Sequence, residues 1–75
     1  MNKNILDLIG IKCPLNYIKV KLYLENIEIG DMIEIYLDDG DPIQNVPNSL
    51  KNDGHEIIEI KQKDHYYVLI IRKNT

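Results

Sequence analysis

Cysteine is scarce in this chain of 75 residues, which contains only Cys13. A single cysteine excludes an intrachain disulfide, whereas small secreted domains of this length usually depend on several. The chain also lacks a run of about 20 apolar residues, the length that a membrane helix needs. The acidic Asp7 interrupts its N-terminal segment, which is not typical of a signal peptide. We therefore expect a single cytoplasmic domain, residues 1–75, with no membrane partner.

Positive charge is not in excess either. The formal net charge is -3, with nine Lys and Arg against 12 Asp and Glu, and a nucleic-acid-binding domain would usually show a basic stripe. No direct nucleic-acid partner is expected. RNA binding by stacking on an exposed sheet face is the weaker alternative. Tyr36, Tyr66 and Tyr67 would be the stacking residues. Positive charge is limited to a small cluster near Cys13, made of Lys12, Lys19 and Lys21, and an acidic loop contains Asp38, Asp39 and Asp41.

Residues that carry catalysis or bind metals are few. There is no glycine-rich phosphate loop and no serine nucleophile elbow. One cysteine with the widely spaced His55 and His65 does not make a zinc site. The acidic loop at Asp38–Asp41 lacks the ligand spacing and terminal Glu of a calcium loop. We expect no metal and no cofactor.

What the chain does contain is a regular alternation of strand and helix patterns. Periods of two predict strands, and Pro14 at a first helical position predicts the start of the first helix. Asp41 and Pro42 are typical of an N-cap and first helical residue, while Pro47 predicts that the second helix is short, kinked or restarted at Asn48. Gly54 is placed to end that helix. The expected strands are 4–10, 32–38, 55–62 and 65–73, and the expected helices are 14–25 and a second one between Asp41 and Gly54.

This order, β-α-β-α-β-β, predicts an α+β fold. A right-handed first crossover makes the first two strands parallel, and the short link through Lys63 and Asp64 makes the last two an antiparallel hairpin. We expect a two-layer α/β sandwich, a four-stranded mixed sheet with two helices on one face. The other face should be more open to water, with Glu34, Tyr36, Glu56 and Tyr67 as candidates to line it.

The first helix has two apolar stripes, although packing on one sheet face needs only one. Tyr17, Val20, Leu24 and Ile27 form the first stripe. The second stripe either covers the edge of the core or is an exposed patch for a partner; its residues are Leu15, Ile18 and Leu22.

Cys13 is the candidate functional residue. If Pro14 is the first helical residue, Cys13 is the N-cap, where first-turn N–H groups and the helix dipole stabilise an anion. Cysteines in such positions can have pKa values lowered from about 8.5 to about 3.5–7.5. The alternative is an inert buried cysteine, since free cysteine is among the most buried residue types.

The segment Leu6–Asn16, "LDLIGIKCPLN", resembles the N-terminal signature of the TusA/SirA-like sulfur-carrier family, a Leu-Asp and a Gly followed by Cys-Pro-x-Pro at the start of the first helix. Later pairs resemble that family's second-helix region and extend the likeness over most of the chain. They are Asp41-Pro42, Val46-Pro47 and Gly54-His55.

The resemblance implies a small sulfurtransferase-like sulfur carrier with Cys13 as its persulfide residue. It implies a sulfur donor such as a cysteine desulfurase, an acceptor sulfur-relay protein, and a pathway such as tRNA thiolation. The exposed edge strands and the second apolar stripe are compatible with a monomer or a weak dimer. The alternative is a non-catalytic interaction or regulatory module on the same fold.

Asn16 stands where the family signature has its second proline. At the third helical position, the Asn16 N–H would be available to the Cys13 sulfur. The sequence therefore predicts that this change maintains or increases thiolate stabilisation.

Overall fold

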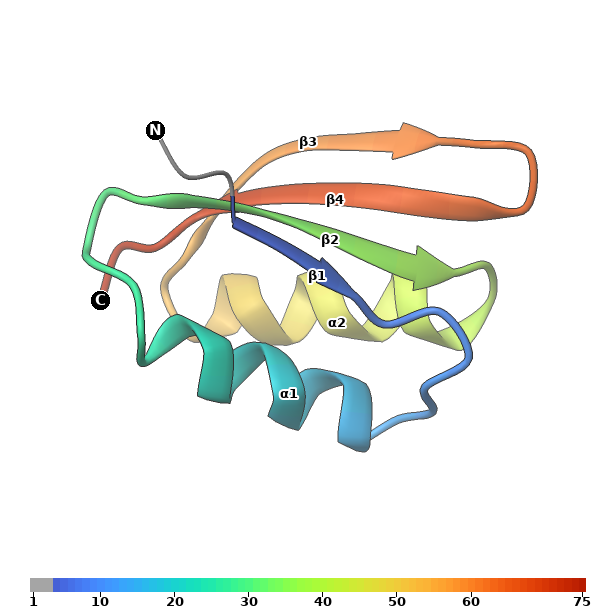
Figure 1. Ribbon diagram of the computed structural model, residues 1–75, viewed down its shortest axis with the longest axis horizontal. Helices are drawn as coiled ribbons and strands as arrows, with labels where there is room; N and C mark the ends of the chain where they lie inside the picture. The colour runs from blue at the N-terminus through green and yellow to red at the C-terminus, as the bar shows by residue number, and fades with distance from the viewer. Residues whose placement is uncertain (1–3) are drawn as a thin grey trace.

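The fold is described by a computed structural model that covers residues 4–75 (Figure 1). Six elements follow one another along the chain, in the order strand, helix, strand, helix, strand, strand. They are β1 (Asn4–Asp7), α1 (Leu15–Leu24), β2 (Met32–Asp38), α2 (Asp41–Asn52), β3 (Glu56–Gln62) and β4 (Tyr66–Arg72). This is the order that the sequence pattern predicted.

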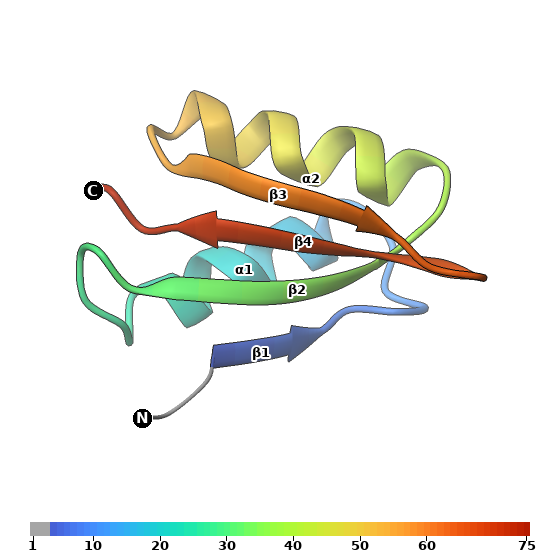
Figure 2. The same ribbon diagram turned by 90° about the horizontal axis from the view of Figure 1, so that it is seen from above.

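The four strands form one mixed sheet with the spatial order β1-β2-β4-β3. β1 pairs with β2 in parallel, while β4 pairs antiparallel with both β2 and β3. Both helices lie on the same side of the sheet, with α1 beneath the middle of the sheet and α2 nearer to β3 (Figures 1 and 2). The expected α+β two-layer sandwich is confirmed.

The core lies between the sheet and the two helices. Alternate residues of β2 point into it, because a strand shows successive side chains to opposite faces. Ile33 and Ile35 lie opposite Ile71 and Leu69 of β4 in the ladder. The helices add four apolar side chains, Val20 and Leu24 from α1 and Val46 and Leu50 from α2.

Several boundaries differ from the sequence expectation by one to three residues. β1 ends at Asp7 instead of Gly10, because the chain turns there: the Ile9 N–H donates to Asp7 Oδ1 at 3.0 Å. α1 begins at Leu15, and Pro14 is its N-cap. The expected Pro14 as first helical residue and Cys13 as N-cap are therefore wrong by one position.

α2 is also displaced and is longer than expected. Its N-cap is Gly40, at a φ of 91° that suits glycine, so Asp41 and Pro42 are the first two helical residues. The helix continues through Pro47, which is buried along with Val46 and Leu50 and so stabilised by packing. The expectation of a short helix or of a restart at Asn48 is wrong.

Gly54 ends α2 as expected. It has a φ of 101°, its N–H donates to Lys51 O at 3.0 Å, and the His55 N–H donates to Leu50 O at 3.1 Å. These two bonds form a Schellman motif, which satisfies carbonyl groups at the helix C-terminus.

The prediction for the face of the sheet away from the helices is confirmed for three of the four residues. Glu34, Tyr36 and Glu56 belong to the open face, but the register places Tyr67 opposite Leu37, on the helix side. Tyr66 takes the open-face position instead, and its ring lies 5.7 Å from that of Tyr36. The pairing of β4 with β2 sets this alternation, because Tyr67 lies opposite the buried Leu37.

Over the described residues 4–75, neither helix is long and apolar enough to cross a membrane.

Candidate functional site

Cys13 lies in the loop that joins β1 to α1, and its side chain is exposed. This loop meets the β2–α2 loop because β1 and β2 are parallel and therefore end at the same edge of the sheet. In open α/β sheets, binding sites commonly form at this edge. The prediction of an exposed cysteine at the mouth of a strand-to-helix turn agrees with this position, and the buried alternative does not.

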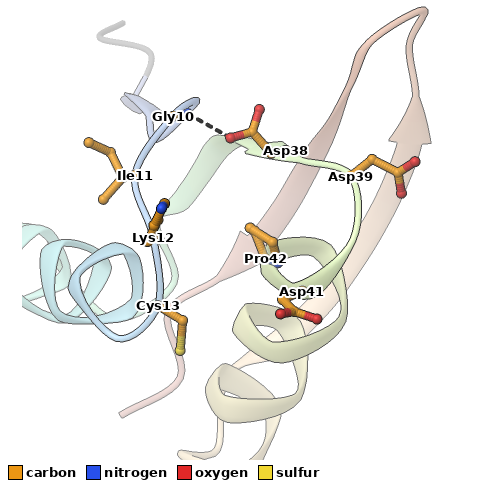
Figure 3. Close-up of a pocket in the computed structure, with 8 residues that line it drawn as sticks. All are labelled: Gly10, Ile11, Lys12, Cys13, Asp38, Asp39, Asp41 and Pro42. Carbon is orange, nitrogen blue, oxygen red and sulfur yellow. Dashed lines mark hydrogen bonds between the residues drawn. The ribbon is translucent and has the colours of Figure 1, made fainter.

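A hydrogen bond between the two loops fixes their relative position. The Gly10 N–H donates to Asp38 Oδ2 at 2.6 Å, across 28 residues of sequence (Figure 3). Gly10 has a φ of 83°, a conformation that glycine adopts without steric strain because it has no Cβ. Sequence reasoning identified both residues but did not join them, because the contact depends on how the strands pair.

Between the loops lies an open pocket of about 520 Å³. Cys13 is on its α1 side, and Asp41 is on the opposite wall at the start of α2 (Figure 3). The pocket joins the predicted acidic loop to the predicted cysteine, which the sequence had left unconnected. Its lining residues are Gly10, Ile11, Lys12, Cys13, Asp38, Asp39, Asp41 and Pro42, with three carboxylates against one ammonium.

The first-turn N–H groups of α1 are mostly engaged. The Asn16 N–H donates to Lys12 O at 3.1 Å, and the Tyr17 N–H donates to Asn16 Oδ1 at 2.7 Å. Pro14 has no side-chain group with which to cap the helix. Within the described part of the chain, the Leu15 N–H is the first-turn donor left without an acceptor.

Asn16 is the second helical residue and is fully buried. Its N–H is directed to Lys12 and not to the Cys13 sulfur, so the mechanism expected for Asn16 from the sequence is wrong. Its side-chain Nδ2 is buried and has no hydrogen-bond partner among the described residues. Buried polar groups are nearly always paired, so this unpaired donor is unusual.

The second apolar stripe of α1 is exposed. Leu15 is 51% exposed, Ile18 44% and Leu22 57%, so these residues do not cover the core edge. Lys12 and Lys19 are exposed beside them. An apolar stripe flanked by positive charge therefore runs along α1 from the loop that holds Cys13.

The two histidines do not take part in this site. Neither His55 nor His65 lines the Cys13 pocket, and within residues 4–75 no cluster of side chains could hold a metal ion. His55 instead accepts a hydrogen bond at Nδ1 from the Asn74 N–H, at 3.2 Å. Burial lowers the pKa of His55, while Asp53 opposes that shift and Lys73 adds to it.

Tyr17 of α1 is bonded to the C-terminal end of α2. Its hydroxyl donates to Asp53, the residue that caps α2. This hydrogen bond raises the pKa of Tyr17, with smaller contributions from burial and from the negative charge of Asp53. The Lys21 ammonium lies 5.5 Å from the centre of the Tyr17 ring. The cluster supports the position of α1, whose first turn follows Cys13.

Comparison with known proteins identifies the family of this chain and relatives of its fold. The family described as sulfurtransferase TusA matches residues 4–73, nearly the whole chain. The chain is similar to the sulfur carrier protein TusA of Buchnera aphidicola, with 29% identity over 73 residues, which cover 97% of this chain and 92% of that protein. Its fold resembles the crystal structure of a SirA-like protein from Desulfitobacterium hafniense, with a TM-score of 0.78 and 19% identity over 95% of this chain and 97% of that one.

The protein thus has the small α+β fold that it shares with the SirA-like structure. More specifically, this chain is a member of the TusA sulfurtransferase family.

Proposed function

We propose that this protein is a cytoplasmic sulfur carrier, in which Cys13 accepts a sulfur atom as a persulfide and passes it to another protein. The observation that carries the proposal is the exposed Cys13 thiol in a pocket at the strand-to-helix loop, in the Cys13-Pro14 pair that resembles the family signature. The relative from Buchnera aphidicola is named as a sulfur carrier.

Two thiol exchange steps suffice for this function. In the first, the Cys13 thiolate attacks the outer sulfur of a persulfide on the donor, for example a cysteine desulfurase. The S–S bond of the donor breaks, the donor leaves as a thiolate, and Cys13 carries the outer sulfur. In the second, a thiolate of the acceptor protein attacks that outer sulfur, and Cys13 leaves as a thiolate.

Neither step uses a metal or a cofactor in the carrier, because a thiolate attacks the transferred sulfur directly. The donor and the acceptor supply the remaining chemistry. This division of labour fits a pocket lined by one thiol, one ammonium and three carboxylates. A pathway such as tRNA thiolation would use a carrier of this kind.

The exposed face of α1 is the proposed contact surface for these partners. It combines the apolar Leu15, Ile18 and Leu22 with Lys12 and Lys19, and it begins beside Cys13. A partner with an apolar patch rimmed by acidic residues would complement it. Docking here would bring the partner's sulfur to the mouth of the Cys13 pocket.

The test is an intact mass spectrum of the reduced protein after incubation with a cysteine desulfurase and free cysteine. We expect the wild type to gain one sulfur atom, removable by a reductant. Cys13→Ser should remain unmodified while retaining the same circular dichroism spectrum and unfolding midpoint.

A second candidate function is a non-catalytic interaction module, which the exposed apolar stripe of α1 and the replaced motif proline favour. Under that alternative, Cys13→Ser would leave partner binding and any cellular phenotype unchanged. If several desulfurases fail to load sulfur onto Cys13 while Cys13 can still be alkylated, the result would refute the proposal that Cys13 carries sulfur from a desulfurase. It would support this second candidate.

A further inference from the structure

The open face of the sheet, which points away from both helices, carries exposed apolar side chains (Figures 1 and 2). Ile5 is 43% exposed and Met32 49%. The strand register places three half-buried apolar side chains beside them, Tyr36, Tyr66 and Ile70. Apolar side chains gathered on one exposed face indicate an interaction surface.

The open face also carries the acidic excess of the molecule. By the strand register, its carboxylates are those of Asp7, Glu34, Asp38, Glu56 and Glu59. Its cations are Lys61 and Arg72. Five negative groups against two positive ones leave a net charge of -3, which equals the formal net charge of the whole chain. Both cations already pair within the face, Lys61 with Glu59 at 3.9 Å and Arg72 with Glu56 at 3.0 Å. A complementary surface is therefore apolar and basic.

The exposed side of α1 has this complementary chemistry. Its apolar stripe consists of Leu15, Ile18 and Leu22, which are 51%, 44% and 57% exposed. From residue 12 to residue 25, the chain has three lysines against one glutamate. Val20 and Leu24 turn the other side of the helix toward the core, so the stripe points away from the sheet. The two surfaces thus lie on opposite sides of the molecule and cannot meet within one copy (Figure 1).

We propose that the open face of the sheet binds the α1 stripe of a second copy of this chain. Charge disfavours the symmetric pairings, because two open faces or two α1 surfaces would place like charges against each other. The contact is therefore heterologous, with a different surface from each copy, and it can extend into short chains of molecules.

The size of α1 keeps this contact weak. A helix of 10 residues is about 15 Å long and about 10 Å wide with its side chains. Its footprint buries roughly 200–300 Å² on each copy, against about 800 Å² on each partner in a stable complex. We expect a Kd on the order of 0.1–1 mM, with dimers and short chains in rapid exchange with the monomer.

Self-association of this kind would regulate access to Cys13, a consequence that rests on the proposed function. The contact covers Leu15 and Ile18, which belong to the surface proposed for the sulfur donor and acceptor. A second copy therefore competes with these partners for α1. At high concentration of the carrier, fewer copies would be open to loading.

The test is a dilution series of the reduced, isotopically labelled protein, followed by amide NMR spectra. The series runs from about 50 µM to about 2 mM, which brackets the expected Kd. At an ionic strength of about 20 mM, where the screening length is about 20 Å, amide shifts should move with concentration on α1 and on the open face of β2 and β4. At about 300 mM salt, the movement should fall severalfold. A reductant throughout prevents disulfide dimers of Cys13.

Two variants each disrupt one surface. Ile18→Glu places a carboxylate in the α1 stripe, and Ile70→Lys places an ammonium on the open face between Glu34 and Glu59. Each variant alone should associate about tenfold more weakly than the wild type. An equimolar mixture of the two should restore the association, because each variant retains the surface that the other has lost. In the mixture, Ile18→Glu should show shifts on its open face, and Ile70→Lys on its α1.

Ile29→Glu and Ile60→Lys are the matched controls, with the same substitutions at isoleucines that are 69% and 47% exposed. Ile29 lies in the α1–β2 loop, and Ile60 lies opposite Leu69 on the helix side of β3. Both variants should associate as the wild type does. If Ile70→Lys fails to fold, Ile5→Lys replaces it at an exposed position of the same face.

Three results would each overturn the proposal. They are spectra that do not change across the dilution series, shifts confined to one of the two surfaces, and a mixture that associates no better than its components. The experiment requires no sulfur donor. Its failure would therefore leave the loading of Cys13 with sulfur untouched, and a failure of loading would leave the self-association untouched.

Discussion

Asn16→Leu should make the protein more stable, although it is a substitution in the core. The wild type leaves the Asn16 Nδ2 buried without a partner, and relieving an unsatisfied buried donor recovers about 1–3 kcal/mol. The substitution also removes the bond from the Tyr17 N–H to Oδ1, a loss of about 0.5–1.5 kcal/mol. Leucine has the same number of side-chain heavy atoms as asparagine and is a better helix former. The net expectation is a gain of about 1 kcal/mol in the free energy of unfolding.

Urea unfolding monitored by circular dichroism measures this gain, since a higher midpoint at an unchanged m-value reports stability directly. For a domain of this size, about 1 kcal/mol corresponds to a rise in Tm of about 4–8 °C. Asn26→Leu serves as the control, because Asn26 is exposed and its Nδ2 already donates to Leu22 O at 3.1 Å. A lower midpoint for Asn16→Leu than for the wild type would refute the reasoning and would show that the carboxamide is satisfied, for example by a buried water.

Three further outcomes follow from contacts away from Asn16. Burial lowers the pKa of His55 in the folded state, so below the unfolded pKa of about 6.5 the unfolded chain binds the proton more readily than the folded protein does. The contribution of neutral His55 to stability is therefore complete above that pKa and is lost as the pH falls below it. The free energy of unfolding should therefore decline between about pH 7 and pH 5, and His55→Gln should reduce that decline in urea titrations at several pH values; an identical pH slope would contradict this. Asp38→Ala removes the acceptor of the Gly10 N–H, so amide hydrogen exchange of the β1–α1 loop should accelerate, measured by mass spectrometry; unchanged protection of that loop would show that the bond does not hold it. Since the hydrogen bond to Asp53 raises the pKa of Tyr17, Asp53→Asn should lower the pH at which Tyr17 ionises, followed by NMR, and no movement would rule out this bond in solution.

The elements of the fold could be predicted because their signals are local. The alternation in Met32–Asp38 identifies a strand with one buried face, and the structure buries Ile33, Ile35 and Leu37. Gly54 could be assigned to a helix end because the left-handed conformation there favours glycine. Local periodicity and turn chemistry act within a few residues, so a single sequence contains them in full.

The errors arose where a position depends on distant parts of the chain. Tyr67 was expected on the open face, but its pairing with β2 places it opposite Leu37, on the helix side. Pro47 was expected to interrupt α2, but it is buried in a helix that continues past it. In both cases tertiary packing outweighed a local preference.

By itself, the sequence determined the element order, the α+β class and Cys13 as the residue to examine. Each of these depends on residue type and spacing along the chain. Only the tertiary structure decided that Cys13 shares a pocket with Asp38, Asp39 and Asp41, that Gly10 is bonded to Asp38, and that Asn16 is buried with an unpaired Nδ2. The reason is physical: parallel pairing of β1 with β2 brings two loops more than 20 residues apart to one edge of the sheet, and helix packing sets which side of α1 is buried.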